Sequence, residues 1–403
     1  MQSRPASVTL ALGTDAYRQG LPVALLRHGM LTRVLRFGLD LEVVDPNGAG
    51  TLEVVKRFPE YKVINRILWA AWRRLPGTEY SHLPKLASTW IADHLVSKYV
   101  PPTSIFHGWS GVCPACLKAA KRHGAITVVE NPTLHLQQWQ DEVITECRHF
   151  GINPRDCSAL LPTPLIRRAR WEYEFCDKIM VLSSVTRRGF EQFGYADKTV
   201  VLLPGVDHLF FTPPSEPKPP RLFRACYVGR VEVAKGLGYL LRAWKWLALP
   251  GAELLLVGEV KPEMEPLLKS CAGLNVRLAG VLPPQEVAKR YRESSVLVFP
   301  SANEGFGVVL LEAMASGIPV IASEKSGAPD CVVERKEGFV VAPRNVDALA
   351  DRILWCYQHP EEGMAMGKAA RASVERRFTL SHYEERQIAW YRTLTNRACQ
   401  PAI

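Results

Sequence analysis

Short apolar segments alternate with amphipathic segments along almost all of this 403-residue chain, and this alternation constrains its fold most strongly. The apolar segments are rich in β-branched residues and have the length of buried strands, while the segments between them have helical periodicity. Strands that alternate with helices predict α/β architecture with parallel sheets covered on both faces. In the first half, the predicted strands are residues 7–13, 40–46, 103–109, 125–131, 178–184 and 199–204.

The chain is too long for one ordinary hydrophobic core, so its length predicts two domains. Helices are predicted at residues 21–38 and 167–177, among others. A segment with five prolines between Pro213 and Pro220 interrupts the pattern, as is typical of a linker. Strands and helices then alternate again. We therefore expect a first domain over 1–210, a linker over 211–221, a second domain over 222–377, and a final helix in 378–403.

Composition limits the class of protein and its location. The chain is 47% hydrophobic and 22% charged, and no run approaches the roughly 18 apolar residues of a membrane-spanning helix. Its first residues lack the apolar helix of a signal peptide, so we expect a cytoplasmic protein. The ten cysteines are then expected to be mostly reduced. Cys113 and Cys116 have a suggestive spacing, but no second ligand pair follows them, and we assign them no role.

The net charge of +10 is concentrated in the first half. Residues 1–205 contain 25 Lys and Arg against 18 Asp and Glu, whereas residues 206–403 contain 25 against 22. We expect no nucleic-acid partner, because the basic residues lack a recognised motif or an array of stacking aromatics. Residues 65–77 combine tryptophans with flanking arginines. This segment is either an interfacial helix on the inner, anionic face of a membrane or a partly buried core helix with basic ends.

The segment from Ser301 to Asp330 contains one carboxylate in an unexpected place. A short helix is predicted over residues 308–316, ended by Gly317, and Glu312 is its only charged residue. Burial of an ionised Glu costs several kcal/mol unless hydrogen-bonding partners meet it. Glu312 is therefore either a ligand-binding group or a core residue with a polar partner.

Directly before this helix comes Glu304-Gly305-Phe306-Gly307, at the carboxyl end of a predicted strand. Backbone amides at a helix start can bind an anion, and ligands of parallel sheets bind at this end of the strands. Two carboxylates that hold hydroxyls, beside amides that hold phosphate, would suit a sugar nucleotide.

Glu304, seven intervening residues and Glu312, within EGFG and LLEAMASGIPVIAS, resemble the signature of retaining glycosyltransferases of GT-B family four, the glycosyl transferases group 1. The resemblance implies two doubly wound, Rossmann-like domains that face each other across a cleft, with the last helix crossing back to the first domain. It also implies that Glu304 binds hydroxyls of the transferred sugar, Glu312 binds the nucleotide ribose, and the amides of residues 305–307 face the diphosphate or the sugar.

Two further segments are similar to motifs of this family. Val228-Gly229-Arg230 followed by Lys235-Gly236 resembles its GR…KG pair, in which Gly229 lets the ligand approach and both cations stabilise the leaving diphosphate. His107 resembles a cleft histidine that contacts the sugar or the acceptor, and a buried structural histidine is the open alternative. Asp330 stands where Glu is more usual in the family.

Other features depart from the family or exclude a related one. The first 60 residues fit worst, because Gly13 and Gly20 stand apart where a Gly-Gly loop is common. The chain contains no Asp-x-Asp triplet, the usual metal ligand of GT-A enzymes. We therefore expect a site without metal or other cofactor.

The resemblance implies a retaining, metal-independent hexosyltransferase with a UDP- or GDP-sugar donor and a glycan, lipid-linked or small-molecule acceptor. Two alternatives stay open. One is a membrane-associated, non-catalytic protein that binds sugar nucleotides, and the other is a sugar-nucleotide epimerase of the same fold.

Overall fold

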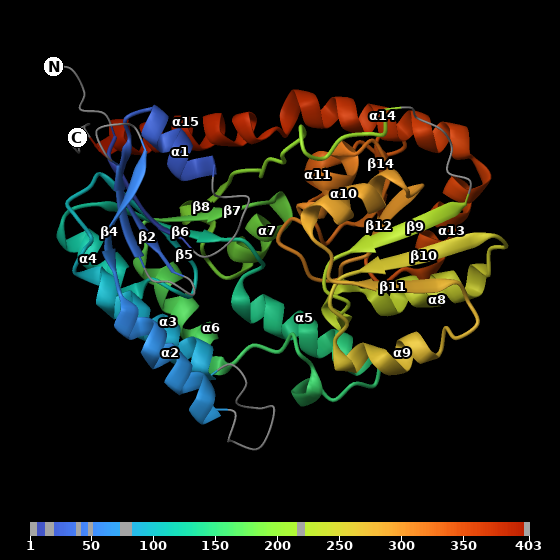
Figure 1. Cartoon of the computed structure of the whole chain (residues 1–403), viewed down its shortest axis with the longest axis horizontal. Helices are drawn as coiled ribbons and strands as arrows, with labels where there is room; N and C mark the ends of the chain where they lie inside the picture. The colour runs from blue at the N-terminus through green and yellow to red at the C-terminus, as the bar shows by residue number, and fades with distance from the viewer. Residues whose placement is uncertain are drawn as a thin grey trace.

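The computed structural model describes residues 6–12, 20–37, 42–46, 51–72, 83–215 and 222–398. It consists of two α/β units side by side, each built on its own sheet (Figure 1). The loop between Gly13 and Gly20, where the family commonly has paired glycines, lies outside the described residues apart from Gly20.

The first sheet has eight strands in the order β4-β3-β2-β1-β5-β6-β7-β8. Strands β1, β2 and β5 to β8 pair in parallel, whereas β3 is antiparallel to both β2 and β4. The strands are β1 (Val8–Leu12), β2 (Leu31–Arg36), β3 (Glu42–Pro46), β4 (Leu52–Arg57), β5 (Ile105–Trp109), β6 (Ile126–Asn131), β7 (Lys178–Val181) and β8 (Thr199–Val201). The helices are α1 (Gly20–Arg27), α2 (Pro59–Trp72), α3 (Leu83–Ser97), α4 (Pro114–Arg122), α5 (Leu136–His149), α6 (Thr163–Phe175) and α7 (Ser184–Gln192).

The predicted helix over residues 21–38 is wrong in its second part. Helix α1 ends at Arg27, and Gly29 follows with a φ of +64°, a conformation that glycine adopts without strain. Residues 31–36 then form β2. At this edge β3 lies within the strand predicted over residues 40–46, but its antiparallel pairing and strand β4 were not predicted. Five residues join β3 to β4, which is enough for a hairpin but too short for the crossover that a parallel pair needs.

The second sheet has six parallel strands in the order β11-β10-β9-β12-β13-β14. The strands are β9 (Phe223–Val228), β10 (Ala252–Val257), β11 (Val276–Gly280), β12 (Val296–Phe299), β13 (Val320–Ser323) and β14 (Gly338–Val341). The helices are α8 (Leu237–Leu247), α9 (Glu265–Lys269), α10 (Pro284–Arg292), α11 (Val309–Ala315), α12 (Ala328–Cys331), α13 (Val346–Gln358), α14 (Pro360–Arg377) and α15 (Leu380–Ala398).

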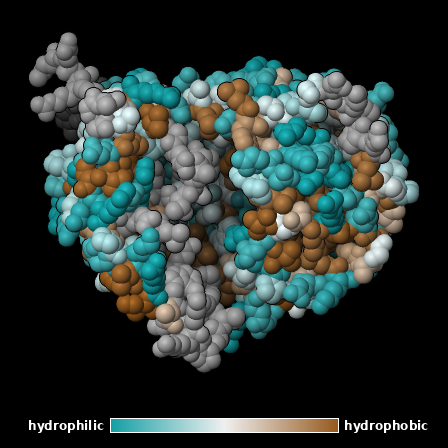
Figure 2. Space-filling view, in the orientation of Figure 1, coloured by the Kyte–Doolittle hydropathy of each residue, from teal (hydrophilic) through white to brown (hydrophobic). Residues whose placement is uncertain are grey.

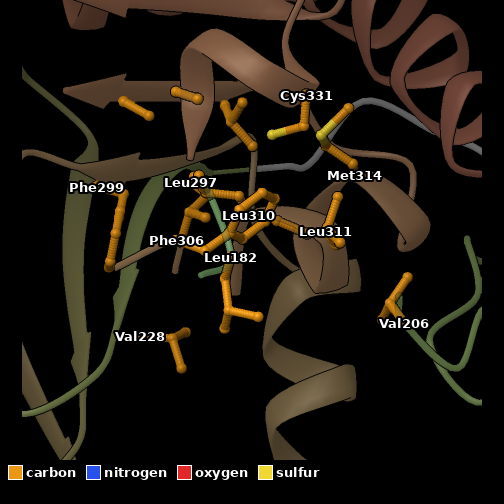
Figure 3. Packing of buried hydrophobic residues seen from close by; sticks show 14 of the residues in the cluster. Leu182, Val206, Val228, Leu297, Phe299, Phe306, Leu310, Leu311, Met314 and Cys331 are labelled. Atoms are coloured by element: carbon orange, nitrogen blue, oxygen red, sulfur yellow. The ribbon is translucent and has the colours of Figure 1, made fainter. Parts of the chain in front are cut away.

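Helices α14 and α15 run along one side of both units, and α15 lies against the first (Figure 1). On α15, Arg386 donates to the carbonyl oxygen of Leu203, and Gln387 contacts the sulfur of Met180. One hydrophobic cluster extends through both units. Figure 3 shows part of it, with Leu182 and Val206 from the first half among residues of the second. The domain boundaries at residues 210, 221 and 377 stay a prediction.

Helix α5 joins the first unit to the second through a cluster of charges. Arg344 follows β14 and donates from Nε to Glu146 at 2.6 Å and from Nη2 to Glu142 at 2.6 Å, and both glutamates lie on α5. The side chain of Glu146 is fully buried. A buried carboxylate that loses its cation is strongly destabilising, so Arg344 is needed to hold α5 against the second unit.

We expect Arg344→Ala to lower the free energy of unfolding by about 3 kcal/mol, because it leaves Glu146 buried and unpaired. Urea denaturation followed by circular dichroism measures this change. The matched control is Arg187→Ala, which removes an ion pair with Glu191 on the surface of α7 and should cost less than about 1 kcal/mol. Equal losses of unfolding free energy in the two variants would show that the interface cluster stabilises the fold no more than a surface ion pair does.

Candidate functional site

The loop between β12 and α11 is fixed against the first unit. A Cβ on Gly305 would lie 1.9 Å from the carbonyl oxygen of Pro132, so only glycine fits at this contact. The carbonyl oxygen of Gly305 accepts hydrogen bonds from the hydroxyls of Ser183 and Thr186, at 2.9 Å from the latter. Ser183 caps α7 at the same time. The loop with the predicted site residues is therefore part of the interface between the two units.

Lys235 and Glu304 form the centre of the candidate site. Lys235 ends the 3₁₀ turn η5 (Val233–Lys235) after β9, and Glu304 follows β12, the neighbouring strand. Lys235 Nζ donates to Glu304 Oε2 at 2.7 Å, with both side chains mostly buried. The ammonium also lies 5.3 Å from the ring centroid of Trp139, on α5 of the first unit. Two residues 69 positions apart, both predicted site residues, are thus brought together.

Gly229 and Arg230 lie in the turn that follows β9. Gly229 has a φ of +145°, and a Cβ there would lie 2.9 Å from the hydroxyl of Tyr227. Arg230 is half exposed, and its Nη2 lies 3.2 Å from Oε1 of Glu232, which is fully buried. Burial raises the pKa of Glu232, while Lys235 and Arg230 oppose that rise. The turn therefore places two cations and a buried carboxylate near Glu304.

Glu312 accepts a hydrogen bond from another side chain of the protein. Its Oε2 accepts a hydrogen bond from the hydroxyl of Tyr291, on α10, at 2.9 Å. Burial raises the pKa of Glu312 to about 7, and the hydrogen bond from Tyr291 lowers it in part. In the described structure Glu312 has no hydrogen bond or ion pair with Glu304, Lys235 or Arg230. Both interpretations from the sequence, a ligand group and a partnered core residue, are compatible with this position.

Backbone amides in the turn before α11 are available as hydrogen-bond donors. Phe306 is buried, and its carbonyl oxygen accepts from the amide of Gly327. Within the described residues, the amides of Phe306 and Gly307 donate no hydrogen bond. Gly307 has a φ of +83°, and a Cβ there would meet the ring of Phe299. The turn thus leaves backbone donors available where the sequence predicts phosphate or sugar.

The structure does not bring His107 to the other predicted residues. His107 lies in the middle of the β5 pairing and is fully buried. Its Nδ1 is hydrogen-bonded to the hydroxyl of Tyr391, on α15, and its Nε2 lies 3.3 Å from Glu130. The geometry thus corrects its placement at the cleft and favours the structural alternative, because α15 covers the ring.

Several contacts that complete the site were not predicted from the sequence. Asp330 accepts from the amide of Ser184, so it joins the second unit to the start of α7. Asn303 donates from Nδ2 to the carbonyl oxygen of Trp139 at 3.1 Å. These contacts have no local signal, because each joins residues more than 140 positions apart. Glu232 lies between the two cations of the GR…KG motif and could have been noticed.

The cysteine pair at Cys113 and Cys116 gives no sign of a reactive or metal-binding role. Both thiols are buried, and burial raises their pKa values well above the ordinary range. In the part of the chain that the structure describes, no three His, Cys, Asp or Glu residues are grouped as metal ligands.

Comparison with known proteins relates part of the chain to one family. Residues 211–373 match the family model of glycosyl transferases group 1. Over 164 residues the chain is 34% identical to the sulfoquinovosyl transferase of Arabidopsis thaliana, a match that covers 40% of this chain and 31% of that protein. Among the relatives compared, the chain spans between 31% and 57% of their length.

Solved structures resemble nearly the whole chain. Sucrose-phosphate synthase from Thermosynechococcus elongatus has a TM-score of 0.67 at 20% identity, and the match covers 97% of this chain and 100% of that one. HepE of Anabaena, solved with UDP and glucose, has a TM-score of 0.62 at 18% identity, with 96% and 99% covered. The chain therefore has the GT-B fold, and its residues 211–373 resemble glycosyl transferases group 1, as its sequence predicts.

Proposed function

We propose that this protein is a retaining glycosyltransferase that moves a hexose from a nucleotide-diphosphate sugar to a hydroxyl of a glycan, lipid-linked or small-molecule acceptor. The observation that carries the proposal is the contact between Lys235 and Glu304 at the carboxyl ends of β9 and β12, beside free amides of the α11 turn. In parallel α/β sheets this edge is where ligands bind. The HepE structure, which shares the fold, contains UDP and glucose.

In this proposal, positive groups stabilise the leaving diphosphate. Arg230 and Lys235 supply two cations, and the amides of residues 305–307 supply oriented dipoles. Donors that are fixed before the reaction stabilise developing charge without reorganisation. They therefore do the work of a divalent cation, and the reaction proceeds without metal. Gly229 leaves room for the phosphate to approach the backbone.

The two glutamates bind the neutral parts of the donor. When the diphosphate attracts Lys235, Glu304 is released from its ion pair and accepts hydrogen bonds from hydroxyls of the sugar. Glu312 accepts from the ribose. The bond between the anomeric carbon and the phosphate oxygen breaks, the acceptor oxygen bonds to the same face of that carbon, and the acceptor proton passes to the released phosphate oxygen. This sequence retains the anomeric configuration.

A second proposal concerns the location of the reaction. In the described residues, no helix has the length and apolar character needed to cross a membrane. Val63 and Ile67, one turn apart on α2, are 55% and 61% exposed, and apolar surface appears over α2 and β4 (Figure 2). We propose that this helix contacts an anionic membrane from the cytoplasm. Arg73 and Arg74, which support this interpretation, lie outside the described residues.

Ile67→Glu should reduce the fraction of protein that sediments with vesicles containing phosphatidylglycerol, because a charge replaces an apolar contact with the interface. Vesicles of phosphatidylcholine alone are the control for the electrostatic part. Equal sedimentation of the variant and the parent protein would refute the membrane proposal and leave the transferase proposal intact.

We expect Glu304→Gln to lower kcat for release of UDP from UDP-glucose by roughly a hundredfold, because the variant loses a charged acceptor that orients the sugar. A coupled assay for UDP measures this rate, and GDP-mannose provides the second donor to be tested. Glu324→Gln, at an exposed position in the same unit, is the matched control and should retain full activity. Full activity in Glu304→Gln would refute the site assignment.

Glu312→Gln should change stability and nucleotide binding in opposite directions. The folded pKa of about 7 lies above the ordinary value of 4.5, so the ionised group destabilises the fold increasingly as the pH rises from 4.5 through 7. At pH 8 the variant should gain roughly 2 to 3 kcal/mol in free energy of unfolding, and at pH 4 almost nothing.

Thermal melts of both proteins at pH 4 and pH 8 measure this difference, and melts with added UDP at pH 8 measure binding by linkage. UDP should raise the Tm of the parent protein more than that of the variant. A gain in stability that does not depend on pH would show that ionisation of Glu312 is not its source.

A further inference from the structure

A pocket lies in the first unit, between helices α3, α4 and α6. Its volume is about 610 Å³, which is in the range of small-molecule binding sites. None of its lining residues belongs to the candidate donor site. Its side chains combine aromatic rings with basic groups around one carboxylate, and the principal ones are Trp90, Asp93, His94, Lys118, Arg168 and Trp171.

Asp93 is the one carboxylate among the described residues that line this pocket, and it already has hydrogen-bonding partners within the protein. Asp93 is fully buried, and it accepts hydrogen bonds from the amides of Ala115 at 2.7 Å and Cys116 at 3.1 Å. Arg168 Nη2 lies 3.3 Å from the same carboxylate. Asp93 therefore fixes the start of α4 and orients Arg168, and little of its negative charge remains for a ligand.

The basic groups retain unused donors. Arg168 lines the pocket, and within the described structure its hydrogen bonds to Asp93 and to the carbonyl oxygen of Val112 both come from Nη2, so that Nη1 donates none. Lys118 Nζ lies 4.9 Å from the ring centroid of Trp171, and no ion pair with a described residue holds it. Hydrogen bonds from a charged donor to an anionic acceptor are among the strong ones, so an anionic group in this pocket would be bound favourably by these two cations.

Two indole rings supply flat apolar surface next to these donors. Trp90 is 56% exposed, and its ring lies 4.4 Å from that of His94 between centroids. Trp171 stacks on Phe175 with its centroid 4.5 Å away and is therefore held in place. A fixed aromatic face packs against the C–H groups on one side of a sugar ring with little loss of side-chain entropy.

We propose that this pocket binds an acidic sugar unit, with its carboxylate or phosphate at Arg168 and Lys118 and its ring against Trp90 or Trp171. The excess of positive charge in residues 1–205 would favour the approach of such a ligand. The choice of a sugar, rather than another ring with an anionic group, rests on the proposed transferase function. The pocket would then hold an acidic unit of the acceptor apart from the reacting hydroxyl.

The test is a ligand-observed NMR titration with three probes: methyl glucuronide, methyl glucoside and benzoate. The first two differ only in the carboxylate, and benzoate has the charge without the sugar. We expect methyl glucuronide to bind, methyl glucoside to bind at least tenfold more weakly, and benzoate to bind no more tightly than the glucoside. Lys118→Ala and Trp90→Ala should each weaken glucuronide binding by roughly tenfold, because each removes one direct contact.

Matched controls are Lys289→Ala on α10 and Trp246→Ala on α8, which remove exposed residues of the same types from the second unit. Equal binding of both methyl glycosides, or unchanged binding in Lys118→Ala and Trp90→Ala, would overturn the proposal. Binding of benzoate without glucuronide would overturn the assignment to a sugar. Release of UDP from UDP-glucose, measured on the same samples, reports the proposed transferase function separately, so its failure does not imitate a failure of this pocket.

Discussion

The contact of Gly305 with the first unit determines how the rest of the candidate site is arranged. The carbonyl oxygen of Gly305 is held by the hydroxyls of Ser183 and Thr186, and its α-carbon lies against the carbonyl of Pro132 with no room for a side chain. Because Glu304 precedes this residue directly, its carboxylate is fixed relative to both units. Lys235 can then reach Glu304 from the neighbouring strand while it lies over Trp139 of the first unit. The site is a property of the interface as much as of either unit.

Charged side chains hold this interface together, and each has a specific partner; one of them, Glu146, is fully buried. Arg344 pairs with Glu146 and Glu142 on α5, and Asp330 accepts from the amide at the start of α7. Such pairs cost desolvation, and they contribute to specificity only when their hydrogen bonds are well made. Glu312 is different, because its single partner in the described structure is a neutral hydroxyl and its pKa is raised to about 7. The candidate site thus contains a carboxylate that the fold leaves incompletely compensated.

The sequence predicted the fold class and the second unit well because both depend on local patterns. Apolar strands alternate with helices, and the loop with Glu304, Gly305 and Gly307 lies at the end of β12 as expected. Prediction was wrong where one pattern allows two structures, as at residues 31–36, which have enough apolar residues for a helix or a strand. His107 was misplaced for a related reason. Its position in β5 is visible in the sequence, but the helix that covers it is 284 residues away. Trp139 and Thr186 could not be found, since only tertiary packing brings them to the site.

We propose that a sugar nucleotide binds between the two units, at Lys235 and Glu304. A crystal structure of the protein with UDP-glucose tests it most directly. We expect the diphosphate to lie within hydrogen-bonding distance of Arg230 and Lys235. Glu304 should have lost its ion pair with Lys235 and accept hydrogen bonds from hydroxyls of the glucose, and the ribose should contact Glu312. Density for UDP-glucose elsewhere, with the ion pair between Lys235 and Glu304 intact, would contradict it.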